Sequence, residues 1–374
     1  MNIKILTPIP FWHVCTQELI DGLKKNSISV TCLDIWELRY IDCNNHIHNL
    51  IPKICIGFTA KIYRRLFRKM IIKKYIHEND IVDIQWCGHY YSKYIESIKK
   101  RKVKIIATLF GSDFYRSSIA EKKIQKKIFE VADKIVMGEN MQKEFDSFFP
   151  GLDNKIEHNQ YGSNRIDLIA KLNTLENRSV YRNKFNISKN KIVVTIGYNA
   201  KKEQQHLLFL NLLKDLNDEI KQKLFLIIPM ALGRTDDYVQ KLKLHIKSLS
   251  IDYLCIENKL TNEELAETKI LSDITVNCQT TDALASSIKE AMTASNVLLV
   301  GDWLPYQVYE KLGVFFERSN KNDFLIRFFN ILENLDLYKK KCQHNKEIIT
   351  RFASWKSVLP KFIDTYKQMN HGRD

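Results

Sequence analysis

The sequence predicts an α/β protein built from two doubly wound, parallel sheets. Its 374 residues, 45% hydrophobic and 27% charged, suit two globular domains. Short β-branched runs alternate with helical patterns along the whole chain, as they do in βαβ units. Two series of such runs flank a polar, strand-poor stretch at 162–190, which we expect to join the two domains.

Ten short runs are the predicted strands, and a helical pattern at 354–369 ends the chain. No apolar stretch approaches the roughly 20 residues that a bilayer span needs. The first residues, MNIKILTPIP, lack the features of a secretion signal. We therefore expect a cytoplasmic protein without a membrane-spanning helix. The predicted strands are residues 2–7, 29–34, 81–86, 103–109, 134–137, 191–197, 224–230, 253–257, 273–277 and 296–301.

Basic side chains are concentrated in the first half of the chain. The net charge is +15, and residues 1–187 hold 31 basic against 20 acidic side chains. The segment 53–77 has eight Lys or Arg, no acidic residue, and apolar residues at helical spacing. Two interpretations are open: an amphipathic helix lying on an anionic inner membrane leaflet, or a solvated helix packed on a sheet. The candidate membrane-facing residues are Arg64, Arg65, Arg68 and Lys69.

Several absences narrow the chemistry. No two glycines are separated by a single residue, so the dinucleotide fingerprint is missing, and the phosphate-binding P-loop pattern is missing too. No two aspartates lie two apart, which disfavours a transferase that holds a metal with a D-x-D pair. No recognisable nucleic-acid module accompanies the basic segment. We expect no cofactor, no bound metal and no nucleic-acid partner.

The stretch 272–305 carries the pattern that is most informative about function. A polar turn leads from a strand into a helix with Ser286 and Ser287 in its first turn. Asp282 and Glu290 lie eight residues apart, so both can address one extended ligand. The free N–H groups at the helix start favour a diphosphate, while Glu290 would accept hydrogen bonds from ribose and Asp282 from a sugar. Alternatively, Asp282 only caps the helix and Glu290 lies on the surface.

The segment DALASSIKEAM, which begins at Asp282, resembles the E-x7-E motif of the family-four glycosyltransferases, with Asp in place of the first Glu. That family is retaining and metal-independent, and it has the GT-B fold of two Rossmann-like domains facing across a cleft. Six further segments resemble the family in the same order along the chain. They are ATLFGSDFYR (107–116), ADKIVMGENM (132–141), NQYGSN (159–164), VVTIGYNAKKEQQHLLFL (193–210), KLTNEELAETKILSDITVN (259–277) and FASWKSV (352–358).

The resemblance implies two domains with different tasks. An acceptor-binding domain is expected at 1–165, with the C-terminal helix 354–370 crossing back to it. A domain that binds the nucleotide sugar is expected at 190–350. In this second domain, the resemblance assigns Asp282 to hydroxyls of the donor sugar and Glu290 to the ribose. The other expected donor-binding residues are Asn199, Lys201, Lys202, Arg234, Ala283, Leu284 and Ser286.

Cations are expected beside the departing diphosphate. Lys201 or Lys202 would supply one of them, and Arg234 is either the second cation or an exposed loop charge. In the first domain, Asp113 follows a strand end and should face the cleft, where it would orient or deprotonate the acceptor hydroxyl. Its alternative role is to cap the next helix. Gly111 and Ser112 are expected to line the same cleft.

The sequence therefore predicts a glycosyltransferase that moves a sugar from a nucleotide-diphosphate sugar to a saccharide acceptor. The basic first domain favours an acceptor linked to a polyprenyl diphosphate, as in the synthesis of O-antigen, lipopolysaccharide or capsule. The cytoplasmic protein would then lie on the inner face of the plasma membrane. Two alternatives are an epimerase of the same fold that acts on a sugar nucleotide, and a non-catalytic subunit that binds a sugar nucleotide or a membrane.

Overall fold

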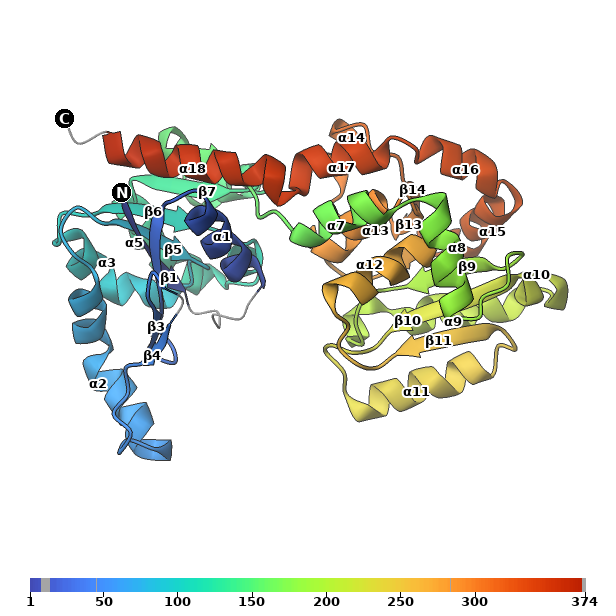
Figure 1. Ribbon diagram of the computed structural model, residues 1–374, viewed down its shortest axis with the longest axis horizontal. Helices are drawn as coiled ribbons and strands as arrows, with labels where there is room; N and C mark the ends of the chain where they lie inside the picture. Colours follow the sequence, from blue (N-terminus) through green and yellow to red (C-terminus); the bar gives the residue numbers. More distant parts are fainter. Residues whose placement is uncertain (8–13, 45, 283, 372–374) are drawn as a thin grey trace. The chain divides into compact units, whose positions relative to one another are not determined.

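The computed structural model describes residues 1–7, 14–44, 46–282 and 284–371. The chain forms two compact units, shown in Figure 1. The first unit is Met1–Gly162 together with Trp355–Asp374, and the second is Ser163–Ser354. Each unit contains one mostly parallel sheet covered by helices, which confirms the predicted α/β class.

The sheet of the first unit has the order β4-β3-β2-β1-β5-β6-β7-β8 among the described residues. Neighbouring strands are parallel, except that β3 pairs antiparallel with both β2 and β4. The order reverses between β1 and β5, so the carboxyl ends of these two strands border the place where such sheets bind ligands. The strands are β1 (Asn2–Thr7), β2 (Ser29–Asp34), β3 (Arg39–Ile41), β4 (Ile47–Asn49), β5 (Ile81–Gln85), β6 (Lys104–Thr108), β7 (Lys134–Met137) and β8 (Ile156–His158).

Helices cover both faces of this sheet. Apolar residues of α1 and α18 share one cluster with one face, and α1 contacts α18 directly (Figure 1). Residues of α2, α3, α5 and α6 share a larger cluster with the opposite face. The helices are α1 (Val14–Lys25), α2 (Gly57–Tyr75), η1 (His89–Tyr91), α3 (Ser92–Lys99), α4 (Ser112–Tyr115), α5 (Ile119–Val131), η2 (Glu139–Met141), α6 (Gln142–Phe148), η3 (Asp153–Lys155) and α18 (Trp355–His371).

Buried polar contacts also attach the last helix to the first unit. The Tyr366 hydroxyl donates a hydrogen bond to Asp83 Oδ2 (2.7 Å), and the Thr108 hydroxyl donates to Asp83 Oδ1 (2.6 Å). Burial raises the pKa of Asp83 above its ordinary value. At the other end of the helix, the Trp355 indole donates to Glu18. Residues from both ends of the sequence thus complete this unit.

The second unit has a six-stranded parallel sheet with the order β11-β10-β9-β12-β13-β14. Numbered within the unit, this is the 3-2-1-4-5-6 order of a nucleotide-binding Rossmann fold. The order reverses between β9 and β12, so the loops after these two strands border the expected ligand site. The strands are β9 (Ile192–Ile196), β10 (Leu224–Pro229), β11 (Asp252–Ile256), β12 (Ile274–Asn277), β13 (Val297–Gly301) and β14 (Glu317–Ser319).

Helices cover both faces of this sheet as well. Helices α9, α11 and α15 pack on one face, while α7, α12, α13, α14 and α17 lie in the smaller clusters that include the other face. The helices are α7 (Asn164–Leu172), α8 (Leu175–Lys184), η4 (Lys202–Gln204), α9 (His206–Leu212), η5 (Leu213–Asp215), α10 (Asp218–Lys223), α11 (Asp236–Lys247), α12 (Asn262–Leu271), α13 (Ser286–Thr293), α14 (Gln307–Lys311), α15 (Phe324–Glu333), α16 (Leu335–Lys341) and α17 (Asn345–Ala353).

All ten predicted strands are present, and their ends differ from the prediction by at most one residue. The sequence analysis missed β3, β4, β8 and β14, each of which has three residues. Such short strands give no run of apolar residues, and β4 is exposed along its whole length. A fully buried strand such as β13 (VLLVG), by contrast, reads as a continuous apolar run.

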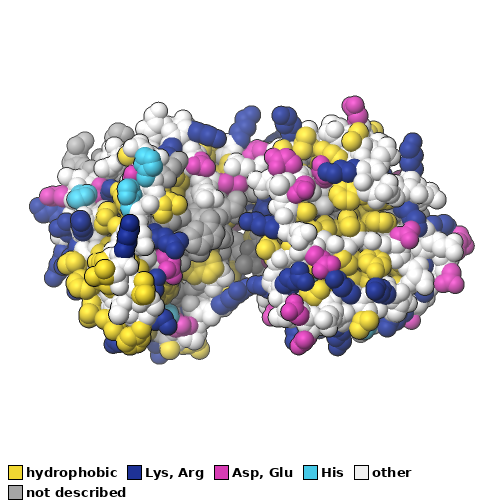
Figure 2. Space-filling view, turned by 60° about the horizontal axis from the view of Figure 1, so that its bottom comes forward, with side chains coloured by type: hydrophobic (Ala, Val, Ile, Leu, Met, Phe, Trp, Pro, Cys, Tyr) yellow, Lys and Arg dark blue, Asp and Glu magenta, His cyan; other side chains and the backbone are white. Residues whose placement is uncertain are grey.

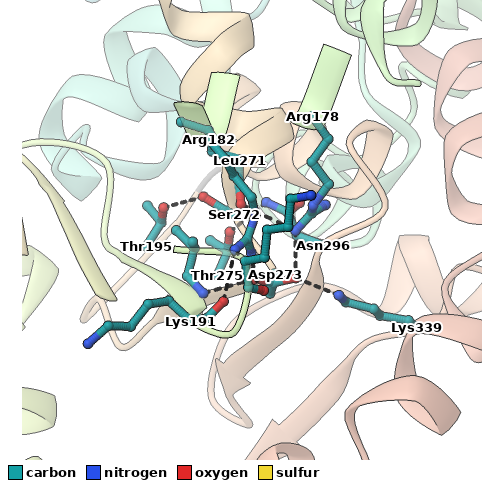
Figure 3. A network of polar contacts seen from close by, with 12 residues as sticks. Arg178, Arg182, Lys191, Thr195, Leu271, Ser272, Asp273, Thr275, Asn296 and Lys339 are labelled. Atoms are coloured by element: carbon teal, nitrogen blue, oxygen red, sulfur yellow. Dashed lines mark hydrogen bonds and ion pairs between the residues drawn. The ribbon is translucent and has the colours of Figure 1, made fainter. Parts of the chain in front are cut away.

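One buried carboxylate ties several elements of the second unit together (Figure 3). Asp273, at the start of β12, lies 2.5 Å from Arg178, 2.9 Å from Arg182 and 2.5 Å from Lys339. It also accepts a hydrogen bond from the Val193 N–H (2.9 Å). The single negative charge therefore compensates cations from α8 and α16 at the amino end of the central strands.

We expect Asp273→Ala to lower the free energy of unfolding by about 3–5 kcal/mol, because it leaves the buried Arg182 and the partly buried Arg178 without a counter-charge. Urea unfolding measures the loss. Asp252→Ala is the matched control: Asp252 is 65% exposed and lies 2.8 Å from Lys191, so its removal should cost less than about 1 kcal/mol. Equal losses in the two variants would contradict this account.

Candidate functional site

Two loops meet at the carboxyl ends of β9 and β12, and the buried side chain of Gln279 joins them. Gln279 Oε1 accepts hydrogen bonds from the Tyr198 hydroxyl (2.9 Å) and from Gln204 Nε2 (2.8 Å). The Thr280 N–H donates to the Glu203 carbonyl (2.9 Å), which adds a backbone link. The loops are therefore fastened to each other without a ligand, at the position where a Rossmann sheet binds a nucleotide.

The backbone of these loops contains several left-handed residues. Gly197 has φ +63°, and a Cβ atom there would lie 2.7 Å from His206 Nε2. Gln205 (φ +53°) ends η4, where a left-handed residue is common, whereas Leu284 (φ +59°) adopts this conformation in a loop although it carries a bulky side chain. A bulky residue whose backbone lies in the left-handed region is strained, and such strain concentrates at functional sites. Burial lowers the pKa of His206 to about 4, so this ring is neutral at neutral pH.

Asp282 stands at the entrance of α13, as predicted. Its carboxylate accepts a hydrogen bond from the Ala285 N–H (3.2 Å) and a short one from the Tyr306 hydroxyl. Asn277 Nδ2 donates to the same hydroxyl (2.8 Å). The side chain thus closes the loop ahead of the helix and stays half-buried. Its contact with a donor sugar stays a prediction.

Residues around Asp282 fall into two groups. Ser286 opens the first turn of α13, where the sequence placed it, and Leu284 is buried in an apolar cluster instead of facing an open surface. Ala283, which was also predicted to bind the donor, lies outside the described residues. The N-cap residue, Ala285, has no side-chain oxygen that could accept a hydrogen bond from an N–H group of the first turn, so the start of this helix is not capped in the usual way.

Glu290 lies in the second turn of α13 and is only 1% exposed, so the alternative of a surface residue is wrong. Arg165 Nε, from α7, is 2.8 Å from Glu290 Oε1. Nevertheless, neither atom makes an aligned hydrogen bond with any described residue. The carboxylate therefore has a neighbouring positive charge and an oxygen that still lacks a well-directed donor.

A second cation lies close to Glu290. Lys269, on α12, is 5% exposed, and its Nζ donates to Ser287 Oγ (2.6 Å) in the first turn of α13. Burial lowers the pKa of Lys269 to about 8, although the charge of Glu290 acts in the opposite direction. Lys269 and Arg165 were not predicted, because only the folded chain brings α7, α12 and α13 together.

The predicted cations lie at the carboxyl ends of β9 and β10. The stem of Lys201 runs over Gly233 (φ +67°), where a Cβ would lie 2.4 Å from Lys201 Cγ. Asn199 Oδ1 accepts a hydrogen bond from the Lys201 N–H (3.0 Å), and the Lys202 side chain is exposed. Arg234, next to Gly233, lies 3.5 Å from Glu257 Oε2, so it is engaged in an ion pair on the surface.

In the first unit, the structure corrects the expected orientation of Asp113. The residue is 4% exposed and both oxygens of its carboxylate already accept backbone hydrogen bonds, so the carboxylate is not available to an acceptor hydroxyl. The Cys87 N–H donates to Oδ2 (2.8 Å) and the Phe110 N–H donates to Oδ1 (3.0 Å). Asp113 therefore joins the loops that follow β5 and β6. Gly111 (φ +99°) precedes the short helix α4, which Ser112 opens.

The four residues predicted to face a membrane do not behave alike. Arg65 and Lys69 are exposed on α2. Arg64 instead lies 2.7 Å from Glu37, and the Arg68 guanidinium lies over the Trp36 ring, 4.7 Å from its centre. Arg64 and Arg68 therefore turn back toward their own unit, which corrects the prediction for these two.

An apolar stripe on the same helix is exposed beside the basic one. Phe58 is 74% exposed and Leu66 is 67% exposed, and Ile62 and Met70 continue the stripe at four-residue steps. Figure 2 shows apolar and basic side chains next to one another at the lower left, in the region of α2. No helix of the described residues is both long and apolar enough to cross a bilayer.

Within the described residues, no three His, Cys, Asp or Glu side chains gather closely enough to hold a metal ion. The metal-free, cofactor-free chemistry expected from the sequence stays a prediction. Among the residues that sequence reasoning missed, Gly197 and Gln279 offered a weak signal, because Gly197 ends one predicted strand and Gln279 lies two residues after another. Polar or Gly residues at that position are common in ligand sites of parallel sheets.

The contribution of Lys269 to stability should depend on pH. The folded pKa of about 8 lies below the ordinary value of 10.5, so above pH 8 the unfolded chain binds the proton more readily. The free energy of unfolding should therefore rise relative to Lys269→Met between about pH 8 and 10.5. Urea unfolding of both proteins across this range measures the difference. If the free energies of unfolding of the wild type and of Lys269→Met change in parallel with pH, the prediction is wrong. The control is Lys241→Met, which removes an exposed lysine of α11.

No protein-family model and no curated protein sequence matches this chain. Solved structures do resemble it. The sucrose-phosphate synthase of Thermosynechococcus elongatus has a TM-score of 0.74 at 10% identity, with all of both chains covered. HepE of Anabaena has a TM-score of 0.72 at 12% identity, covering 98% of this chain and 100% of HepE.

A glycosyltransferase of Rickettsia africae has a TM-score of 0.71 at 15% identity, and the match covers 98% of each chain. At such low identities the similarity concerns the fold. These neighbours are GT-B proteins, and they match essentially the whole length of this chain. The chain therefore has the GT-B fold that the sequence predicted.

Proposed function

We propose that this protein is a glycosyltransferase of the family-four type, which moves a sugar from a nucleotide-diphosphate sugar to a saccharide hydroxyl. The observation that carries the proposal is the pair of loops joined by Gln279 at the switch point of the second sheet. Lys201 belongs to one of these loops, and Glu290 lies on α13, the helix that follows the other, which suits a diphosphate at the first and a ribose at the second. HepE, a structural neighbour, was solved with UDP and with UDP-glucose.

The donor would bind along these loops in a defined direction. Glu290 Oε1, which lacks an aligned donor among the described residues, would accept a hydrogen bond from a ribose hydroxyl. The N–H groups at the start of α13 would face the diphosphate, together with Lys201 or Lys202. Asp282 would accept from hydroxyls of the sugar. Arg234 would join the diphosphate only by leaving Glu257.

The proposed reaction is metal-independent and retains the anomeric configuration. The acceptor oxygen attacks the anomeric carbon from the face that the diphosphate leaves. The bond from that carbon to the phosphate oxygen breaks, and this oxygen takes the proton of the acceptor hydroxyl. The enzyme contributes mainly by stabilising the negative charge of the departing diphosphate, which is the role of the cations and helix N–H groups.

We further propose that the acceptor is a saccharide linked to a polyprenyl diphosphate, as used for O-antigen or capsule. The exposed stripes of α2 support this proposal. Lys61, Arg65 and Lys69 follow one another at four-residue steps, beside the apolar stripe that begins at Phe58. Apolar residues would enter the headgroup region while the cations attract anionic lipid. This arrangement would hold a cytoplasmic enzyme at the inner face of the plasma membrane.

Nucleotide sugars should raise the melting temperature of the protein in a panel of UDP, GDP, ADP and TDP sugars. At 100 times its dissociation constant, the true donor adds about 2.7 kcal/mol of stability. Lys201→Met should weaken this stabilisation, because the diphosphate loses a cation. Lys241→Met, which removes an exposed lysine of α11, should leave it unchanged.

Glu290 is tested with Glu290→Gln in place of Ala, because Gln removes the negative charge but fills the same buried space and keeps a side-chain oxygen near Arg165 and Lys269. The Gln variant should keep the fold and lose most of the transfer to a polyprenyl-diphosphate-linked saccharide, detected by mass spectrometry. Conversion of the nucleotide sugar without any acceptor would instead identify an epimerase. If none of the nucleotide sugars stabilises the protein, the proposed function is refuted.

The membrane proposal has its own test. The triple variant Lys61→Gln, Arg65→Gln, Lys69→Gln should bind vesicles that contain anionic phosphatidylglycerol more than 100-fold more weakly than the wild type, because each lost charge costs about 1 kcal/mol. Sedimentation with the vesicles measures this affinity. Arg64→Gln with Arg68→Gln is the matched control, since both side chains turn toward Glu37 and Trp36. Equal binding by the two variants would rule out an electrostatic membrane contact through this stripe.

A further inference from the structure

The first unit contains a strained aromatic residue at its own switch point. Trp86 directly follows β5 and has φ +58°. The left-handed region costs an L-residue roughly 1–2 kcal/mol, and a bulky aromatic there is an outlier. Ser27 and Lys102 share this conformation, but they follow helices, where a left-handed residue is a common way to end the helix. Trp86 ends a strand, so helix termination does not explain it.

Several buried hydrogen bonds hold Trp86 in this conformation. The Trp86 N–H donates to the Thr108 carbonyl (3.1 Å), and the Gly88 N–H donates to the Trp86 carbonyl (2.7 Å). The next residue, Cys87, is fixed from both sides. Its N–H donates to Asp113 Oδ2 (2.8 Å), and its carbonyl accepts from Gln125 Nε2 (2.8 Å). The surrounding structure thus determines the strained geometry.

The same groups fix a second aromatic residue. Asp113 Oδ1 accepts the Phe110 N–H, and Gln125 Nε2 also donates to the Asp113 carbonyl (2.8 Å). The ring centres of Trp86 and Phe110 lie 5.6 Å apart, and Phe110 stacks on Tyr161 at 4.3 Å. One buried carboxylate and one buried amide therefore set the positions of two neighbouring rings at the carboxyl ends of β5 and β6.

These rings are not core residues in the ordinary sense. Trp86 and Phe110 are half-buried, while the polar groups that fix them, Asp113 and Gln125, are buried. If the two rings only filled space in the core, they would be more buried than the polar side chains that fix them. The left-handed position would then be expected to carry Gly or Asn. The strained backbone instead places the indole of Trp86 at the edge of the sheet where parallel sheets bind ligands.

We propose that Trp86 is the platform on which a pyranose ring of the acceptor saccharide stacks, and that Asp113 is the positioning residue for this platform. The inference rests on the proposed glycosyl transfer and names the contact made by the acceptor. A pyranose with equatorial hydroxyls has a face of axial C–H bonds, which the electron-rich face of an indole attracts. Asp113 then acts through backbone N–H groups, without taking the acceptor proton.

Saturation-transfer NMR on the full-length protein tests the platform directly. The probes are methyl β-D-glucoside and methyl N-acetyl-β-D-glucosaminide, without donor. The protein should transfer saturation mainly to the axial protons on one face of a bound sugar. Trp86→Gly should lose at least tenfold in saccharide affinity, although Gly adopts φ +58° without strain. Trp86→Phe, which keeps a ring, should retain most of the binding.

The nucleotide-sugar thermal shift is the second readout, because the proposed donor site lies in the other unit. It should be the same in wild type, Trp86→Gly and Asp113→Asn, which also shows that the variants fold. Asp113→Asn should reduce the saccharide signal, since its amide cannot accept both N–H groups. Unchanged saccharide binding by Trp86→Gly, no saccharide binding by the wild type, or displacement of the sugar by UMP would each overturn the inference. If no nucleotide sugar shifts the melting temperature of the wild type, the proposed function is refuted instead.

Discussion

The second unit depends on the electrostatic balance at the amino end of β12. Asp273 is the buried carboxylate that compensates Arg178, Arg182 and Lys339 and also receives the Val193 N–H. Charges removed from water are costly unless they are paired and hydrogen-bonded. The contact fixes β9 and β12 side by side, and these are the strands between which the order of the sheet reverses. The geometry at the opposite, carboxyl end of the strands follows from it.

At that carboxyl end, the two units use a similar device. In each, a buried polar side chain fastens two neighbouring loops: Gln279 joins the loops after β9 and β12, where the strand order reverses, and Asp113 joins the loops after β5 and β6, next to the reversal in the first unit. In each, a bulky residue near this point is left-handed, Leu284 in one and Trp86 in the other. Strain of this kind survives only where the neighbouring contacts determine it. At both edges, hydrogen bonds within the chain hold the loops in place.

The sequence was sufficient for the fold because buried parallel strands appear as continuous apolar runs. Strand β13 is such a run and is buried at every residue, and its ends were predicted to within one residue. The missed strand β4 is exposed at every residue and has only three residues, so it carries no such pattern. Its pairing with β3 is a tertiary event that local sequence does not encode.

The site was predicted less completely, for a related reason. The spacing of Asp282 and Glu290 is local, and so the sequence placed both correctly on α13 and its entrance. Arg165, which lies beside Glu290, comes from a distant helix, and no spacing rule connects the two. The burial of Asp113 likewise depends on Cys87, a partner on another strand end.

The return of α18 to the first unit has a consequence for biosynthesis. Ile3, Ile5 and Leu19 share a cluster with Phe362 and Tyr366, so part of this unit has no cover until the ribosome has made the last helix. The second unit, by contrast, is contiguous in the sequence, and all of it is made before α18. Until α18 is made, the apolar residues that it covers stay exposed on the nascent chain, and such transiently exposed surface favours aggregation during folding.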